Sequence, residues 1–143
     1  MKQFDLPPVW TLVFAVLAWV QPFRLDLAML KPLALVFWLA AAFLFLAASM
    51  EFLRSKTSII PRQTPSAMIN GGIFRISRNP IYLADVLILA GVTFWTGSII
   101  GFGLVPVLVW VLTQRFIVGE EAALRETFAE EFDEYSKNVR RWL

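Results

Sequence analysis

LALVFWLAAAFLFLAASMEFL, residues 33–53, is the stretch that decides the fold class, because Glu51 is its only charged residue. A helix of this length, at about 1.5 Å per residue, crosses the hydrocarbon core of a bilayer, which is about 30 Å thick. In the whole chain 58% of the residues are hydrophobic and 17% are charged, which is too apolar for a monomeric soluble domain. The sequence therefore predicts an all-α integral membrane protein.

Three further apolar blocks occur, at about residues 9–23, 81–95 and 99–118. With residues 33–53 they predict a polytopic protein of about four transmembrane helices, in one membrane domain that covers residues 1–143. The first and third blocks are short, so they need flanking residues or locally thinned lipid to cross the bilayer. No small-residue cleavage site follows the first block, so we expect it to be retained rather than removed as a signal peptide.

The cationic side chains are divided unevenly between the two sides of the predicted bundle. With four crossings, the N-terminus, the loop 54–80 and the tail 119–143 share one side, and the other side has only Arg24 and Lys31. The richer side holds Lys2, Arg54, Lys56, Arg62, Arg75, Arg78, Arg115, Arg125, Lys137, Arg140 and Arg141. Because positively charged loops stay in the cytoplasm, we expect both termini and the active site to be cytosolic, in a protein of the cell (inner) membrane.

The formal net charge of +2 is too small to favour a nucleic-acid partner. Contact with anionic membrane lipids is a simpler explanation of these cations than a nucleic-acid partner. The chain has no Cys and no His, which excludes disulfides, thiolate nucleophiles, zinc sites and the usual Ser–His pairs. Any chemistry must use Arg, Asn, Tyr, Asp and Glu.

Polar residues gather where the block 81–95 begins. Asn79 is a good N-cap and Pro80 suits the first helical position, so this segment can serve simply to start a helix. Arg75 and Arg78 flank the same helix start, whose backbone N–H groups and positive dipole end attract anions. A plain helix start and an anion site are both compatible with these residues.

Tyr82 and Asp85 continue one face of this predicted helix, because they follow Asn79 at successive spacings of three. Gly91 lies further along, where the missing side chain lets another backbone or a flat ligand approach closely. An acid inside a membrane helix is costly, so Asp85 either faces an interior cavity or partner or reaches back to the interface.

The cytosolic end of the block 99–118 is followed by Glu120 and Glu121. Glu121 and Arg125 have the i,i+4 spacing of an ordinary surface pair on a helix. The tail 119–143 has apolar residues at intervals of three and four, which predicts a C-terminal amphipathic helix on the membrane or on the bundle. These residues are Leu124, Phe128, Phe132, Tyr135, Val139 and Trp142.

Several of these residues form an ordered set with defined spacing. The set is Gly72-x-Phe-Arg-x-Ser-Arg-Asn-Pro-x-Tyr-Leu83, then Gly91, then Glu120-Glu121-x-x-Leu124, then Phe128-x-x-Glu-Phe-x-x-Tyr135, then Val139-Arg-Arg-Trp142. It resembles the isoprenylcysteine carboxyl methyltransferase and phospholipid methyltransferase superfamily over about residues 57–143. The chain departs from the pattern at Asn79, where many members have His, and at Ala129, where the family has Gly and we expect only a local effect.

The resemblance implies an integral membrane methyltransferase that uses S-adenosyl-L-methionine. It implies a cofactor site between the helix start after the Arg-Asn-Pro-x-Tyr motif and the Glu-Glu pair. Because Asn does not titrate near neutral pH, its presence at position 79 argues against a required proton transfer there. The candidate cofactor-binding residues are Arg78, Asn79, Pro80, Tyr82, Gly91, Glu120 and Glu121.

The favoured acceptor is an ionised carboxylate on a lipophilic molecule that enters from the bilayer, as in isoprenylcysteine O-methylation. Such a displacement needs alignment and exclusion of water but no base, and Arg115 is the candidate to hold the carboxylate. A phospholipid amine must instead lose a proton, for which Asp85 is the candidate. An NADPH-dependent membrane reductase and a non-catalytic membrane adaptor are the alternative functions. The sequence leaves the oligomeric state open.

Overall fold

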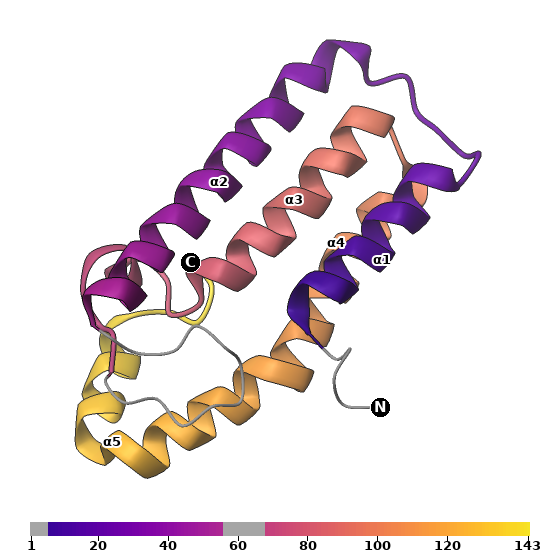
Figure 1. The fold of residues 1–143 in the computed structure, drawn as a ribbon. Coiled ribbons are helices and arrows are strands. Elements are labelled where there is room, and N and C mark those ends of the chain that lie inside the picture. The colour runs from indigo at the N-terminus through magenta and orange to yellow at the C-terminus, as the bar shows by residue number, and fades with distance from the viewer. Residues whose placement is uncertain (1–5, 56–67) are drawn as a thin grey trace.

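The computed structural model describes residues 6–55 and 68–143. The described residues form an elongated bundle of helices, with the C-terminal helix bent across one end (Figure 1). The α-helices are α1 (Pro7–Val20), α2 (Lys31–Arg54), α3 (Pro80–Thr96), α4 (Ile99–Leu112) and α5 (Val118–Asn138). The shorter elements are the 3₁₀-helices η1 (Ala28–Leu30) and η2 (Gly72–Arg75) and the π-helix η3 (Thr113–Ile117).

The predicted apolar helices are present, but they differ in length. α2 with η1, and α4 with its continuation through η3 into α5, are long and apolar enough to cross a membrane. α1 has 14 residues and α3 has 17, which correspond to about 21 and 25 Å of helix and fall short of a 30 Å core. The structure therefore supports two membrane-crossing candidates by length and composition, and the predicted number of four is not established.

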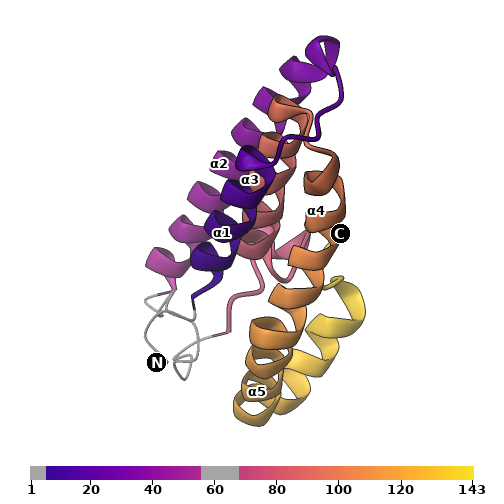
Figure 2. The same cartoon turned by 90° about the vertical axis from the view of Figure 1, so that its right-hand side faces the viewer.

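α3 lies in the middle of the bundle, with α2 on one side and α1 and α4 on the other (Figures 1 and 2). α2 approaches α3 through Ala34, Ala41 and Ala48, which are all buried. Their spacing of seven residues places small side chains along a single seam, so the two helix backbones can come close. Gly91 of α3 faces the Trp38 indole of α2, in space that a Cβ atom would need.

The apolar side chains divide between a small core and a large outer surface. Side chains from α1, α3, α4 and η3 form the core cluster, which includes Phe14, Leu89, Leu108 and Phe116. Many large apolar residues of α2 point outward instead, and Leu39 is 71% exposed. Because such a surface is unfavourable in water but not in lipid, the distribution agrees with a bundle that is surrounded by a bilayer.

The loop predicted for residues 54–80 is described only from residue 68 onward, so its prolines Pro61 and Pro65 lie outside the described residues. Its last part turns at Gly72, whose φ of 53° is in the left-handed region that favours glycine. Glu51 of α2 packs against this turn, and the rings of Phe52 and Phe74 stack edge to face at 5.7 Å. The end of α2 thereby holds the segment that leads into α3.

The C-terminal helix is not the single amphipathic helix that the sequence predicts. α5 bends at Ala129, where φ is 36° and ψ is −107°, and its second half folds back toward the start of α3 (Figures 1 and 2). Phe132 is buried inside the bend, with the Arg125 guanidinium 5.2 Å from its ring centroid. Arg125 pairs with Asp133 at 2.8 Å and not with Glu121. Folding the helix back on itself therefore buries Phe132 and leaves the other apolar residues of this stripe half-buried.

We expect Ala129→Gly to stabilise the protein by about 1 kcal/mol, because glycine adopts a positive φ without the strain that a Cβ atom causes. Ala122→Gly, at an exposed position in the regular first half of α5, should instead destabilise by about 0.5–1 kcal/mol. Denaturant unfolding in detergent measures both changes. Equal destabilisation by the two substitutions would contradict a strained backbone at residue 129.

Candidate functional site

Three segments that are far apart in the sequence meet at one end of the bundle. They are the start of α3, the first turn of α5 and the last residues of the chain, 139–143. The π-helix η3 contributes to this arrangement, because its wider turn shifts the angular position of the residues that follow it, and π-turns of this kind are frequent at functional sites. After η3, Glu120 and Glu121 face α3 and the C-terminal segment.

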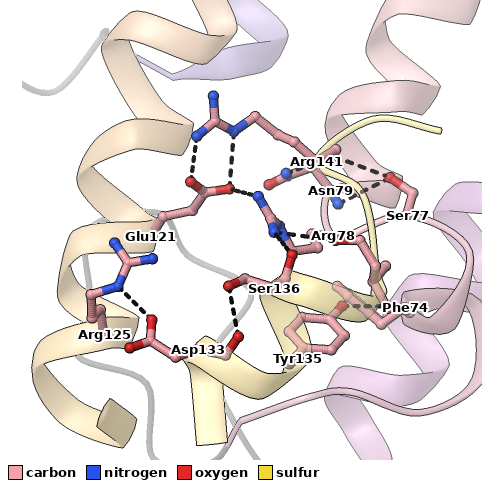
Figure 3. A network of polar contacts seen from close by, with 11 residues as sticks. Phe74, Ser77, Arg78, Asn79, Glu121, Arg125, Asp133, Tyr135, Ser136 and Arg141 are labelled. Atoms are coloured by element: carbon pink, nitrogen blue, oxygen red, sulfur yellow. Dashed lines mark hydrogen bonds and ion pairs between the residues drawn. The ribbon is translucent and has the colours of Figure 1, made fainter. Parts of the chain in front are cut away.

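Glu121 is the centre of a charged cluster (Figure 3). Arg141 donates from Nε to Glu121 Oε1 at 3.0 Å and from Nη2 to Oε2 at 2.6 Å. Arg78 Nη2 donates to Glu121 Oε1 at 2.8 Å. The side chains of Arg78 and Glu121 are only 13% and 12% exposed, whereas that of Arg141 is 37% exposed. Such short, charge-assisted contacts in a shielded place fix both guanidinium groups.

The same cluster holds the C-terminal segment against the start of α3. Arg78 Nη1 donates to the carbonyl oxygens of Ser136 and Val139 at 2.9 and 3.1 Å, and its backbone N–H donates to Arg140 O at 3.0 Å. Asn79 Nδ2 donates to Arg141 O at 2.9 Å. Asn79 is the N-cap of α3 in position, but its side chain makes no capping bond; it holds the chain end instead. Pro80 occupies the first helical turn, as the sequence predicts.

A second carboxylate lies beside the cluster. The Tyr82 hydroxyl donates to Glu120 Oε1 at 2.6 Å, and the Tyr82 ring packs against Phe116 of η3 with a centroid separation of 6.2 Å. Tyr82 is buried and Glu120 is half-buried. Tyr82 therefore orients Glu120 at the boundary between the apolar core and the polar end of the bundle.

The charges of the cluster change the acidity of its members. Burial raises the pKa of Glu121, but the hydrogen bond from Arg141 and the positive charges of Arg78 and Arg141 outweigh it, so the pKa lies below its ordinary value of 4.5. The hydrogen bond to Glu121 raises the pKa of Arg141. Burial raises the pKa of Tyr135 to about 12, against the opposing charge of Arg78. Tyr135 thus stays a donor near neutral pH, and its hydroxyl bonds Phe74 O at 2.6 Å.

Three of the sequence-predicted site residues contact other parts of the bundle. Gly91 faces Trp38 between α2 and α3. Asp85 is buried at 7% exposure and lies near the Thr11 side chain of α1; its Oδ2 atom has no partner among the described residues. Arg115 lies with its guanidinium 5.2 Å from the ring centroid of Trp10. The structure thus brings together Arg78, Asn79 and Glu121, with the Tyr82–Glu120 pair beside them.

Arg141 is the site residue that the sequence reasoning did not select. The motif Val139-Arg-Arg-Trp142 contributed only to the family resemblance. In the structure Arg141 binds Glu121, and Trp142 packs against the core cluster. The motif contains Arg141, but a local sequence pattern does not show that the bend at Ala129, twelve residues earlier, returns residues 139–143 to α3.

A cavity of about 430 Å³ opens next to the cluster. Its lining includes Asn70, Arg75, Glu131 and Glu134, and it shares Tyr135 and Val139 with the contacts described above. This volume is within the range of small-molecule sites. The lining of this cavity contains both acidic and basic side chains.

An apolar helical body with a buried cluster of charges at one end agrees with a membrane enzyme. A family model described as phospholipid methyltransferase matches residues 33–131, which is more than half of the chain. The chain belongs to the phospholipid methyltransferase family. A Haemophilus influenzae protein described as uncharacterized is 36% identical over 63 residues, which are all of that protein and 44% of this chain. No solved structure matches the chain.

We expect Glu121→Gln to destabilise the protein by about 1–3 kcal/mol near neutral pH, because the neutral Gln side chain cannot replace the carboxylate that both guanidinium groups bind. Since folding lowers the pKa of Glu121 below 4.5, the wild-type advantage is complete above that pH. It declines as the pH falls through the lowered, folded-state pKa.

Denaturant unfolding between pH 3 and pH 7 measures this difference. Glu130→Gln, which removes the same charge from an exposed position of α5, serves as the matched control and should change stability by less than about 0.5 kcal/mol. A Glu121→Gln effect that is equally small, or that does not depend on pH, would refute the role of the ion pairs.

Proposed function

We propose that this protein transfers a methyl group from S-adenosyl-L-methionine to a lipophilic acceptor at the cytosolic face of the cell membrane. The family match supports methyl transfer. The observation that carries the site assignment is the convergence of Arg78, Asn79, Tyr82, Glu120 and Glu121 at one end of α3. These residues come from the motifs on which the family resemblance rests.

The residues present fit the cofactor in charge. S-Adenosyl-L-methionine, when bound, supplies an activated methyl group on a positively charged sulfur, and its methionine part carries an ammonium and a carboxylate. Glu120 would face the positive groups, and Tyr82 would hold Glu120 in position. Arg141, which is partly exposed, would face the carboxylate. The buried Nε atom of Arg78 has no partner among the described residues and adds one donor to this set.

An ionised carboxylate is the acceptor that best suits the acid–base properties of the cluster. Such an acceptor would take the activated methyl group directly on oxygen, so no residue of the cluster would have to accept a proton. Glu121 is held ionised by two guanidinium groups, so it is not suited to serve as a base, and Glu120 is held by the hydrogen bond from Tyr82. The cluster then has to align the reactants and exclude water.

The surface around the site supports a lipophilic acceptor. Exposed apolar side chains cover the outer face of α2, and the core cluster reaches the site through Tyr82 and Phe116. An acceptor with an apolar tail would approach through lipid and present its polar group at the boundary. Arg115, beside Trp10 at the same boundary, is the proposed contact for the acceptor carboxylate.

A phospholipid amine is the second candidate acceptor, and one observation favours it. Asp85 is a buried acid on the face of α3 that includes Tyr82, and its Oδ2 atom lacks a partner among the described residues. An amine must be neutral to attack and must lose a proton, and Asp85 is the group placed to accept one.

We expect Glu120→Gln to weaken the binding of S-adenosylmethionine about tenfold, which corresponds to the loss of one charge-assisted contact. Isothermal titration calorimetry on detergent-purified protein measures this, with S-adenosylhomocysteine and NADPH as further ligands. Glu126→Gln, at an exposed position of α5, is the control that should leave binding unchanged. Weakening by Glu131→Gln alone would place the cofactor in the adjacent cavity, and binding of NADPH alone would favour a reductase.

The acceptor classes are distinguished by Asp85→Asn, which keeps the size of the side chain and removes the acid. With a carboxylate acceptor we expect kcat to change by less than about threefold, whereas an amine acceptor predicts a loss of at least about 10²-fold. Turnover of a prenylated cysteine and of phosphatidylethanolamine, measured with protein whose thermal unfolding is unchanged, tests this. Equal activity on a water-soluble acceptor without an apolar tail would contradict the lipophilic substrate class.

A further inference from the structure

The end of the bundle opposite the charged cluster is also built by specific contacts. The chain between α1 and α2 pairs with the turn between α3 and α4: Leu25 N–H donates to Gly97 O at 2.7 Å, and Ile99 N–H donates to Phe23 O at 3.2 Å. Gly97 has a φ of 65°, and a Cβ atom there would meet the Leu25 carbonyl oxygen. The connection is therefore held in one position on α3.

Both cations of this end lie in that fixed region. Arg24 donates through its two Nη atoms to the carbonyl oxygens of Trp19 and Thr96, which anchor its guanidinium group. Three of its five N–H groups are not used in these two hydrogen bonds. The Lys31 ammonium lies 5.5 Å from the ring centroid of Trp95. It makes no ion pair with any residue that the structure describes, so its three donors are available.

A cavity of about 340 Å³ opens between these groups. Trp19, Arg24, Asp26, Lys31 and Trp95 are among the residues that line it. Asp26 is the acidic residue of the lining, and its Oδ1 atom accepts the backbone N–H of Ala28 at 3.2 Å. The two cations and one acid leave the lining with a net charge of +1, and α2 adds the positive end of its dipole at Lys31.

We infer that this cavity binds the phosphate of an anionic phospholipid head group. A phosphate accepts hydrogen bonds from both guanidinium and ammonium groups. The surroundings match a lipid rather than a free phosphate, because Trp19 and Trp95 are the aromatic type found at membrane interfaces, and Phe23 and Met29 beside them are 64% and 91% exposed. A choline head group would bring its own cation against Lys31 and Arg24, so the site discriminates against zwitterionic lipid.

This lipid site is separate from the proposed methyl-transfer site. The two lie at opposite ends of α3 (Figure 1), a helix of 17 residues and thus about 25 Å long. The inference therefore depends on the location of the protein in a membrane and not on the reaction that it catalyses.

Native mass spectrometry of the full chain in detergent, titrated with phosphatidylglycerol or phosphatidylcholine, tests the inference. We expect a saturable phosphatidylglycerol complex that Lys31→Gln weakens about tenfold and that Lys31→Arg retains. Arg54→Gln is the matched control, because Lys31 and Arg54 are the first and last residues of the same helix; it should leave this affinity unchanged.

Three results would overturn the inference. They are equal weakening by Lys31→Gln and Arg54→Gln, equal affinity for phosphatidylcholine, and equal affinity for glycerol 1-phosphate, which would make the ligand a soluble phosphate. Binding of S-adenosylmethionine, measured on the same Lys31→Gln protein, should match that of the wild type. The lipid site and the proposed function can thereby fail separately.

Discussion

A carboxylate removed from water is tolerated only where cations and hydrogen bonds replace its hydration, and the polar end of this protein is arranged around that requirement at Glu121. Two guanidinium groups satisfy it, Arg78 from the segment before α3 and Arg141 from the end of the chain. The position of each arginine is then fixed by backbone carbonyls and by Asn79. Glu121 therefore fixes three segments relative to one another: the start of α3, the first turn of α5 and the chain end.

The body of the bundle obeys a different constraint. In a membrane the hydrophobic effect does not drive one apolar helix against another, so close packing between small residues has to do so. The buried alanines of α2 and the fit of Trp38 against Gly91 are consistent with this condition. The large apolar residues of α2 face outward, where lipid covers them at no cost. Polar chemistry is confined to the ends of the bundle.

Much of this organisation follows from periodicity and composition. The apolar blocks at residues 33–53 and 99–118 predict α2 and the α4–η3 segment closely, because long apolar runs have few alternatives to a helix in lipid. Pro80 predicts the start of α3 because proline suits the first turn of a helix. The family resemblance supplied Asn79, Tyr82, Glu120 and Glu121 as a group, and the structure shows how they are paired.

The parts that sequence reasoning missed depend on single backbone irregularities. The bend at Ala129 and the π-turn at residues 113–117 leave the apolar spacing almost unchanged, so periodicity cannot reveal them. These two irregularities nevertheless change the tertiary structure, because they bring Arg141 to Glu121 and Arg125 to Asp133. The position where the chain has Ala in place of the family pattern's Gly is the position of the positive φ, where glycine would be free of the strain that a Cβ atom causes.

The position of Arg141 in the cluster also sets the order of events during synthesis. The ion pairs of Glu121 join it to residues 43 positions earlier and 20 positions later. The apolar helices can enter the membrane as each is made, whereas the cluster is incomplete until residue 141 has left the ribosome. The charged end is thus expected to mature last, by closing a preformed bundle, and substitutions in α5 would delay closure of the cluster more than they delay insertion.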